Sequence, residues 1–240
     1  MKKLLLSILL TVSTTCAVLA QNLGLSFSYF IPKNGYFSTP ISPFSIRGVG
    51  FDINRFIAIE TGASLYRMSG LSMKDLPLKS KDPFVGPNFT IFVPVELVFQ
   101  LKGNNVEFDI KGGGFFFYAF DQKLNYGNID KAVREYENWT VANSSLSFQN
   151  KPGFGYHFGG ELTINVTQQV GVSLETNYLV GQSALPLKGS YVGGTDVIQA
   201  PKDVDYKDAK VDFTGLEFSI GLIFDTGGGG PAPKAKRRRR

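Results

Sequence analysis

Apolar and polar residues alternate with a period of two along much of the chain. The alternation is clear in eight segments: 22–30, 45–53, 56–66, 89–100, 106–120, 153–164, 170–180 and 213–224. Successive side chains of a β-strand point to opposite faces, so this period predicts strands with two chemically different faces. Each segment is close to the roughly 9 to 11 residues that a tilted strand needs to cross a bilayer.

One face of each predicted strand is apolar, and the other is small or charged. In segment 89–100, five apolar residues share one face: Ile91, Val93, Val95, Leu97 and Phe99. Glu96 and Gln100 lie on the opposite face. Aromatic residues gather near both ends of the apolar faces: Tyr29, Tyr118, Phe120, Phe154, Tyr156 and Tyr178 near one end, and Phe51, Phe99, Phe108 and Phe224 near the other. An apolar outside with two aromatic belts and a small or charged inside suits a barrel in lipid.

Short and long connections alternate between the predicted strands. The short ones are expected at 54–55, 102–105 and 166–169, and the long ones at 31–44, 67–88, 121–152 and 181–212. Outer-membrane barrels have short periplasmic turns and long external loops, whereas a soluble β-sandwich, the alternative, does not sort its connections in this way. We therefore predict an all-β fold: an eight-stranded antiparallel up-and-down transmembrane β-barrel.

The two ends of the chain differ from the predicted barrel. Residues 1–20 combine Lys2 and Lys3, an apolar run and a small-residue exit at Ala20, which is typical of a secretory signal peptide. We expect the barrel over residues 21–225 and a flexible Gly/Pro hinge with a basic tail over 226–240. The expected location is the outer membrane, with both termini in the periplasm, because the strand number is even. The single cysteine, Cys16, lies in the predicted signal peptide, so no disulfide or thiolate site is expected in the mature chain.

The net charge of +5 comes from the two ends. Without the eight basic residues of the signal peptide and tail, 17 basic residues face 20 acidic ones. We therefore expect no nucleic-acid partner. The basic tail residues are Lys234, Lys236, Arg237, Arg238, Arg239 and Arg240. They are interpreted as a solvated end or as a contact for an acidic partner or anionic envelope material; insertion into the barrel and a vector-derived extension are further alternatives.

Charged residues recur on the inward faces of the predicted strands. The predicted polar network of the lumen consists of Glu60, Glu96, Lys111, His157, Glu161, Glu175 and Glu217. Arg47 is a further candidate, although a bulge at Gly48 or Gly50 would change the face on which it lies. Because the carboxylates outnumber the cations, water, protonation or an added cation must compensate them. We expect a structural ion-pair network in this narrow barrel.

We predict no enzymatic activity, no cofactor and no metal site. His157 is the single histidine, and nothing in the spacing places a serine and an acid beside it. In the third long loop, Ile129, Ala132, Val133 and Tyr136 recur at helical spacing and predict a short amphipathic helix. Trp139, Tyr136 and Tyr191 are predicted partner contacts in the external loops.

The eight segments and the ending "EFSIGLIF" resemble the small outer-membrane β-barrels of Bacteroidota. They are similar to PorT-like barrels and, more distantly, to the OmpA-type domain. The ending also resembles the signal read by the barrel-assembly machinery, carried here by Glu217, Ser219, Leu222 and Phe224, with serine where glycine is usual.

The resemblance implies an accessory or scaffold subunit of an envelope complex, with type IX-like protein secretion or outer-membrane protein assembly as its setting. The implied partners are outer-membrane lipid, other envelope proteins and, during biogenesis, the barrel-assembly machinery. A stand-alone surface adhesin and a small-solute pore are the alternatives.

Overall fold

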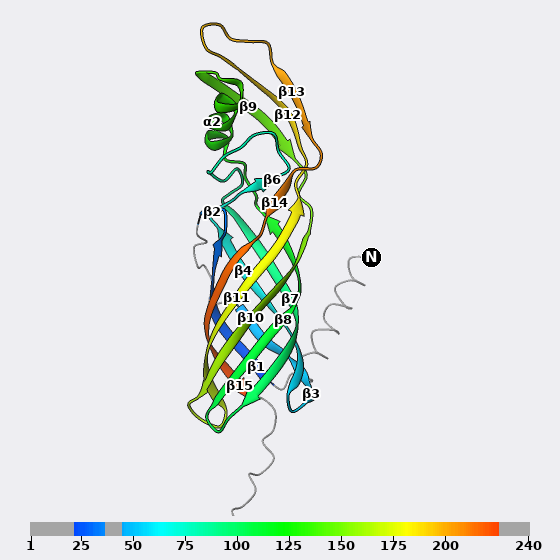
Figure 1. The fold of residues 1–240 in the computed structure, drawn as a ribbon, viewed down its shortest axis with the longest axis vertical. Coiled ribbons are helices and arrows are strands. Elements are labelled where there is room, and N and C mark those ends of the chain that lie inside the picture. The colour runs from blue at the N-terminus through cyan, green and yellow to red at the C-terminus, as the bar shows by residue number, and fades with distance from the viewer. Residues whose placement is uncertain (1–21, 37–44, 226–240) are drawn as a thin grey trace, which may run out of the picture.

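A computed structural model describes residues 22–36 and 45–225 and contains a closed antiparallel barrel. Its eight strands are β1 (Asn22–Pro32), β3 (Ser45–Asn54), β4 (Ile57–Met68), β7 (Asn88–Lys102), β8 (Val106–Phe120), β10 (Gly153–Asn165), β11 (Val170–Ala184) and β15 (Gly215–Asp225). Each strand pairs with its neighbours in chain order, and β15 closes the ring on β1 (Figure 1). The predicted fold class is confirmed. The predicted signal peptide and basic tail lie outside the described residues.

Closure joins the first and last strands of the barrel into one ring. The pairing of β1 with β15 is unbroken from Asn22 opposite Asp225 to Pro32 opposite Gly215. A spanning structure in lipid has to pair its backbone groups internally, and a closed barrel meets this need. The three short turns lie at one end of the barrel, and the long connections gather at the other (Figure 1). We call these the turn end and the loop end; β1 begins and β15 ends at the turn end.

The two faces of the barrel wall differ as the alternation predicts. In β11, Val172 and Leu174 are exposed, whereas Ser173 and Glu175 are buried. The outward aromatic side chains include Phe154, which is 64% exposed near the loop end, and Phe51, which is 50% exposed near the turn end. The outer surface of the barrel is therefore apolar with aromatic residues toward both ends, the arrangement that a lipid bilayer favours.

Aromatic rings fill the loop half of the barrel interior. The aromatic plug consists of Phe30, Phe92, Phe115, Phe117 and Phe213, all at most 4% exposed. The ring of Phe213 stacks on Phe117 at a centroid distance of 4.4 Å and on Phe30 at 4.6 Å. The prediction of a small or charged inner face was wrong for this half. The run of three phenylalanines and a tyrosine at 115–118 is aromatic on both faces, so its inward members carry no alternation signal.

The long connections form ordered structure at the loop end. Strands β9 (Val141–Phe148), β12 (Leu187–Gly194) and β13 (Lys202–Tyr206) form a three-stranded sheet, and helix α2 (Tyr126–Glu137) packs on β9. We call these four elements the loop module. The short strands β2 (Gly35–Tyr36), β5 (Gly70–Leu71), β6 (Met73–Lys74) and β14 (Lys210–Asp212) lie between the barrel and the module (Figure 1).

The predicted amphipathic helix is present as α2. It buries Ile129, Ala132 and Val133, and the side chain of Asn125 accepts a hydrogen bond from the backbone N–H of Asn128 at its first turn. Tyr136, the fourth residue of the pattern, is 53% exposed, and its role as a partner contact stays a prediction. Within the described residues, no helix is long and apolar enough to cross a membrane.

The position of Phe213 predicts that it stabilises the closed barrel. Replacing Phe213 with alanine leaves a void among stacked rings, and we expect the free energy of unfolding to fall by about 3 to 5 kcal/mol. Urea unfolding in detergent micelles, followed by circular dichroism, measures the change. Phe158→Ala is the matched control, because Phe158 is 61% exposed on the outer surface and its removal opens no internal void. Equal losses for the two variants would contradict the plug.

Candidate functional site

A cluster of buried ionisable side chains fills the barrel next to the aromatic plug. Each of its side chains belongs to a residue that is at most 7% exposed: Arg47, Glu60, Glu96, Lys111, His157, Glu161, Glu175 and Glu217. We call these eight residues the interior charge cluster. The structure therefore brings together all seven residues of the predicted lumen network and adds Arg47.

Arg47 is the hub of one half of the cluster. Its Nη2 donates to Oε1 of Glu217, and its Nη1 lies 3.7 Å from Oε1 of Glu96 and 3.9 Å from Oε1 of Glu175. The pairing of β3 with β4 does shift register between Ile46 and Val49, where Gly48 has a φ of 68°. Arg47 lies within this irregular stretch, and its side chain is buried and faces inward.

Lys111 is the hub of the other half. Its Nζ contacts Glu161 and lies 3.3 Å from Oε2 of Glu60 and 4.0 Å from Oε2 of Glu96. Nε2 of His157 lies 3.1 Å from Oε1 of Glu96. Glu96 is therefore the residue that links the two halves.

Hydrogen bonds from neutral side chains complete the surroundings of Glu217. The hydroxyl of Tyr66 donates to Oε1 of Glu217, and Nδ2 of Asn177 donates to Oε2 of Glu217 at 2.9 Å. The same Nδ2 donates to Oε1 of Glu175 at 2.7 Å. Buried charges are tolerated when they are paired and hydrogen-bonded, and Glu217 meets both conditions.

Carboxylates outnumber cations in the barrel interior. The cluster has five glutamates against Arg47 and Lys111. Asp109 adds another acid: it is 6% exposed and lies on the same face of β8 as Lys111. Asp109 is absent from the predicted lumen network, although its spacing of two residues from Lys111 places it on the same inward face.

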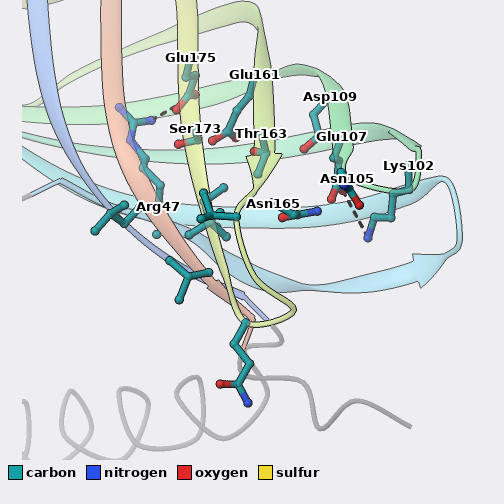
Figure 2. Close-up of a pocket in the computed structure, with 18 of the residues that line it drawn as sticks. Arg47, Lys102, Asn105, Glu107, Asp109, Glu161, Thr163, Asn165, Ser173 and Glu175 are labelled. Carbon is teal, nitrogen blue, oxygen red and sulfur yellow. Dashed lines mark ion pairs between the residues drawn. The ribbon is translucent and has the colours of Figure 1, made fainter. Parts of the chain in front are cut away.

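A cavity of about 570 Å³ lies between the cluster and the turn end. Figure 2 shows Glu107 and Asp109 of β8 on one side and Thr163 of β10 near them. Lys102, at the turn, lies 3.4 Å from Oε1 of Glu107. Arg47 and four of the lining carboxylates are in or next to the charge cluster, and none of the plug residues lines the cavity. We call it the turn-end cavity.

The residues of the predicted assembly signal lie on the closing strand β15. Glu217 and Ser219 are buried and face the interior, whereas Leu222 and Phe224 belong to the outward set. Oγ of Ser219 lies 2.7 Å from Oγ of Ser28 on β1, so the small side chain suits the seam between the first and last strands. That the barrel-assembly machinery recognises these four residues stays a prediction. The basic tail, Lys234 to Arg240, lies outside the described residues.

Two of the predicted loop contacts are part of the loop module's own packing. Tyr191 is 6% exposed, and its hydroxyl donates to Oε1 of Glu137 at 2.6 Å. The ring of Trp139 meets that of Tyr191 edge-on at 5.9 Å, and Nζ of Lys202 lies 5.1 Å from the centre of the Trp139 ring. The prediction that Tyr191 contacts a partner was wrong, because its side chain is buried within the small sheet of the loop module.

The far tip of the loop module exposes apolar side chains. Val197 is 75% exposed and Ile198 is 62% exposed in the connection between β12 and β13, at the end of the molecule away from the barrel (Figure 1). Val141 is 49% exposed and lies opposite Gly194, which also bridges Ile198. We call these three residues the distal tip. An exposed apolar group of this kind is suited to contact with another macromolecule.

The structure offers no arrangement that suggests catalysis or metal binding in its described part. No group of three or more histidine, cysteine, aspartate or glutamate side chains there is placed to hold a metal ion. His157 has Glu96 beside it and packs against Phe115, with ring centres 6.1 Å apart. The absence of an enzymatic role stays a prediction.

No family model matches the chain, and no curated protein shows a significant match. Among solved structures, the chain is similar to the outer membrane protein OprG from Pseudomonas aeruginosa, with 10% identity over 85% of this chain and 93% of that chain and a TM-score of 0.43. A major outer membrane protein from Thermus thermophilus is 8% identical over 85% and 98%, with a TM-score of 0.43. Ail, the attachment invasion locus protein of Yersinia pestis, is 10% identical over 85% and 94%, with a TM-score of 0.36. These values are too low to transfer a function to this chain.

The contacts of Arg47 predict a large loss of stability when its charge is removed. Replacing Arg47 with methionine leaves Glu217 and its neighbours without their cation, and we expect the free energy of unfolding to fall by about 3 to 5 kcal/mol. The double variant R47M/E217Q should recover part of this loss, because one unpaired charge is removed. Lys131→Met, which breaks an exposed pair with Asp82, is the control and should cause no measurable change. An Arg47→Met variant as stable as the parent would contradict the role of this hub.

The loop module should loosen in acid through Glu137. The ammonium of Lys202 and the hydroxyl of Tyr191 hold the pKa of the Glu137 carboxyl below its ordinary value. A carboxyl with a lowered pKa in the folded state stabilises the fold above its unfolded pKa of about 4.3, and this contribution is lost as the pH falls further. Trp139 is the single tryptophan of the chain, so we expect its fluorescence emission to shift to longer wavelength in this acid range.

Two variants test this assignment. Glu137→Gln should abolish the acid-dependent shift of the Trp139 emission, whereas Glu135→Gln, which changes an exposed carboxyl on the same helix, should keep it. An unchanged acid response in Glu137→Gln would show that another group controls the module.

Proposed function

We propose that this protein is a non-enzymatic outer-membrane barrel that acts as an accessory or scaffold subunit of an envelope complex. The observation that carries the proposal is the division of the molecule into a filled barrel and an ordered module. Stacked aromatic rings occupy the loop half of the interior, so the lumen offers no evident route for a solute. The loop module, by contrast, presents the distal tip to its surroundings.

The chemistry of the surface supports an outer-membrane location. The outward faces of the barrel strands are apolar, the aromatic side chains lie toward both ends, and the charged side chains are inside. Together with a signal-peptide pattern at residues 1–20, these features favour export and insertion into the outer membrane. In this arrangement the turn end and both termini are periplasmic, and the loop module is external.

The resemblance of the final strand and of the strand pattern to PorT-like barrels favours a role in type IX-like protein secretion or in outer-membrane protein assembly. Such a role would make other envelope proteins the partners of the loop module. A stand-alone adhesin is the second candidate, and the exposed apolar side chains of the distal tip favour it as well. The aromatic plug argues against the small-solute pore.

The distal tip gives the proposal a direct test. We expect a stoichiometric envelope protein to copurify with the full-length chain from its native outer membrane in mild detergent. The variant V197S/I198S should lose this partner, because it removes the two most exposed apolar side chains of the tip. The flanking variant D196S/Q199S is the matched control, since both residues are exposed and polar, and it should keep the partner.

Two outcomes would overturn the scaffold role. If the parent chain and both variants are purified alone and monomeric, the protein has no stable partner of this kind. If V197S/I198S instead reduces the attachment of whole cells to a surface, while no partner copurifies with the parent, the adhesin replaces the scaffold.

A further inference from the structure

The two edges of the loop-module sheet differ in how they are covered. The strand order is β13-β12-β9, with α2 beside β9 (Figure 1). Two side chains of α2 cover the β9 edge: Oδ1 of Asp130 accepts a hydrogen bond from the N–H of Ser144 at 2.8 Å, and the hydroxyl of Tyr126 donates to the carbonyl oxygen of Leu146 at 2.7 Å. Among the described residues, no strand pairs with β13 on its side away from β12. We call this side the β13 edge.

The register of the sheet shows which backbone groups point out at the β13 edge. The N–H of Ser144 points to α2, so its pair with Tyr191 of β12 is of the type without backbone hydrogen bonds. Tyr191 therefore turns its backbone groups toward β13, where Lys202 lies opposite. Because this direction alternates along a strand, Asp203 and Asp205 direct their N–H and C=O groups away from β12. Such a row of backbone groups can pair with another strand.

One face of the sheet beside the β13 edge is apolar. Val204 and Tyr206 point to the side of α2 and are half-buried there. Burial and the nearby Tyr136 raise the pKa of the Tyr206 hydroxyl, and Tyr136 itself is 53% exposed. An added strand would cover this face with its own side chains, so apolar side chains fit there.

On the other face, Asp203 determines which charge fits. Its side chain is exposed and lies opposite the neutral Ser190 of β12. The next carboxylate on this face, Asp205, is already paired: its Oδ2 lies 3.4 Å from Nζ of Lys188 and 3.7 Å from Nζ of Lys207. Opposite charges across a strand pair are favourable and like charges are not, so a basic side chain fits opposite Asp203.

A second copy of this chain does not match the β13 edge. Antiparallel pairing of two β13 strands centred on Val204 would set Asp203 of each copy opposite Asp205 of the other. Like charges directly opposite each other destabilise a strand pair. The edge therefore favours a different polypeptide.

We propose that the β13 edge is a docking site for an extended segment of another polypeptide, in which apolar residues alternate with lysine or arginine. The segment adds a fourth, antiparallel strand to the sheet. Its basic residue opposite Asp203 exchanges backbone hydrogen bonds with that residue, and its apolar residues pack beside Val204 and Tyr206. This inference rests on the proposed function and deepens it, because it names the chemistry of the partner that the loop module binds.

Binding of a model peptide tests the chemistry of the edge. The probe is a labelled octapeptide of alternating valine and lysine, added to the full-length chain in detergent, and fluorescence anisotropy measures its affinity. We expect the counterpart with glutamate in place of lysine to bind at least about fivefold more weakly.

Methylated forms of the probe test the backbone pairing. In the proposed register, the N–H groups of the lysines point to β13 and those of the valines point away. N-methylation of the lysine nitrogens should therefore weaken binding at least about fivefold, whereas N-methylation of the valine nitrogens, the matched control, should leave the affinity unchanged.

Two variants of the chain locate the binding at Asp203. Asp203→Pro removes an outward N–H and keeps the pairing with β12, because proline is tolerated where the N–H of an edge strand faces away from the sheet. Asp203→Asn removes the charge alone. We expect Asp203→Pro to bind the valine–lysine peptide at least about fivefold more weakly than Asp203→Asn. Trp139 fluorescence confirms that the module is folded in both variants.

The opposite results would overturn the proposal. No binding to the parent, equal binding of the two methylated forms, or equal binding by the two variants would show that the edge takes no added strand. Equal binding of the lysine and glutamate peptides would exclude a basic partner. A dimer of the parent in analytical ultracentrifugation that Asp203→Pro abolishes would assign the edge to a second copy.

Copurification from the native membrane separates this inference from the scaffold role. We expect Asp203→Pro to lose the envelope protein that Asp203→Asn retains. A partner that both variants retain would contradict the β13 edge and leave the scaffold role intact, whereas the absence of any partner from the parent would contradict the scaffold role itself.

Discussion

Closure of the sheet is the constraint on which the rest of the structure depends. The unbroken pairing of β15 with β1 and with β11 closes the ring of strands. Because the backbone is paired within the sheet, the outward side chains can be apolar. Eight strands enclose a space about as wide as the side chains that fill it. From the loop end to the turn end, the interior therefore holds the aromatic plug, the interior charge cluster and the turn-end cavity.

Hydrogen bonds within the charge cluster also connect the closing strand, β15, to three other strands. Glu217 lies on β15, and its side chain receives hydrogen bonds from Arg47 on β3, Tyr66 on β4 and Asn177 on β11. These contacts cross the barrel interior and add to the backbone pairing of β15. The guanidinium of Arg47 also lies 5.7 Å from the centre of the Phe92 ring, so the cluster and the plug meet at this residue. Removing Arg47 would disturb both layers.

The strand pattern was predictable from the sequence because lipid imposes one simple rule on every outward residue. Other features depend on contacts between distant segments. The sheet of the loop module pairs Leu187 with Phe148, two residues from different long connections whose local sequence gives no sign of this pairing. Phe213, placed by the alternation at the start of the last strand, instead precedes β15 and enters the plug. The inward residues of the charge cluster could be found by alternation, whereas their pairing could not.

Electrical conductance across a planar lipid bilayer tests the filled interior most directly. The full chain and the version that stops after Asp225 are inserted separately, with a porin of known conductance as positive control. The structure predicts no steady stepwise conductance for either protein, because the plug of stacked rings does not depend on the tail. A steady, ion-selective channel formed by both versions would contradict the filled barrel and the function proposed from it.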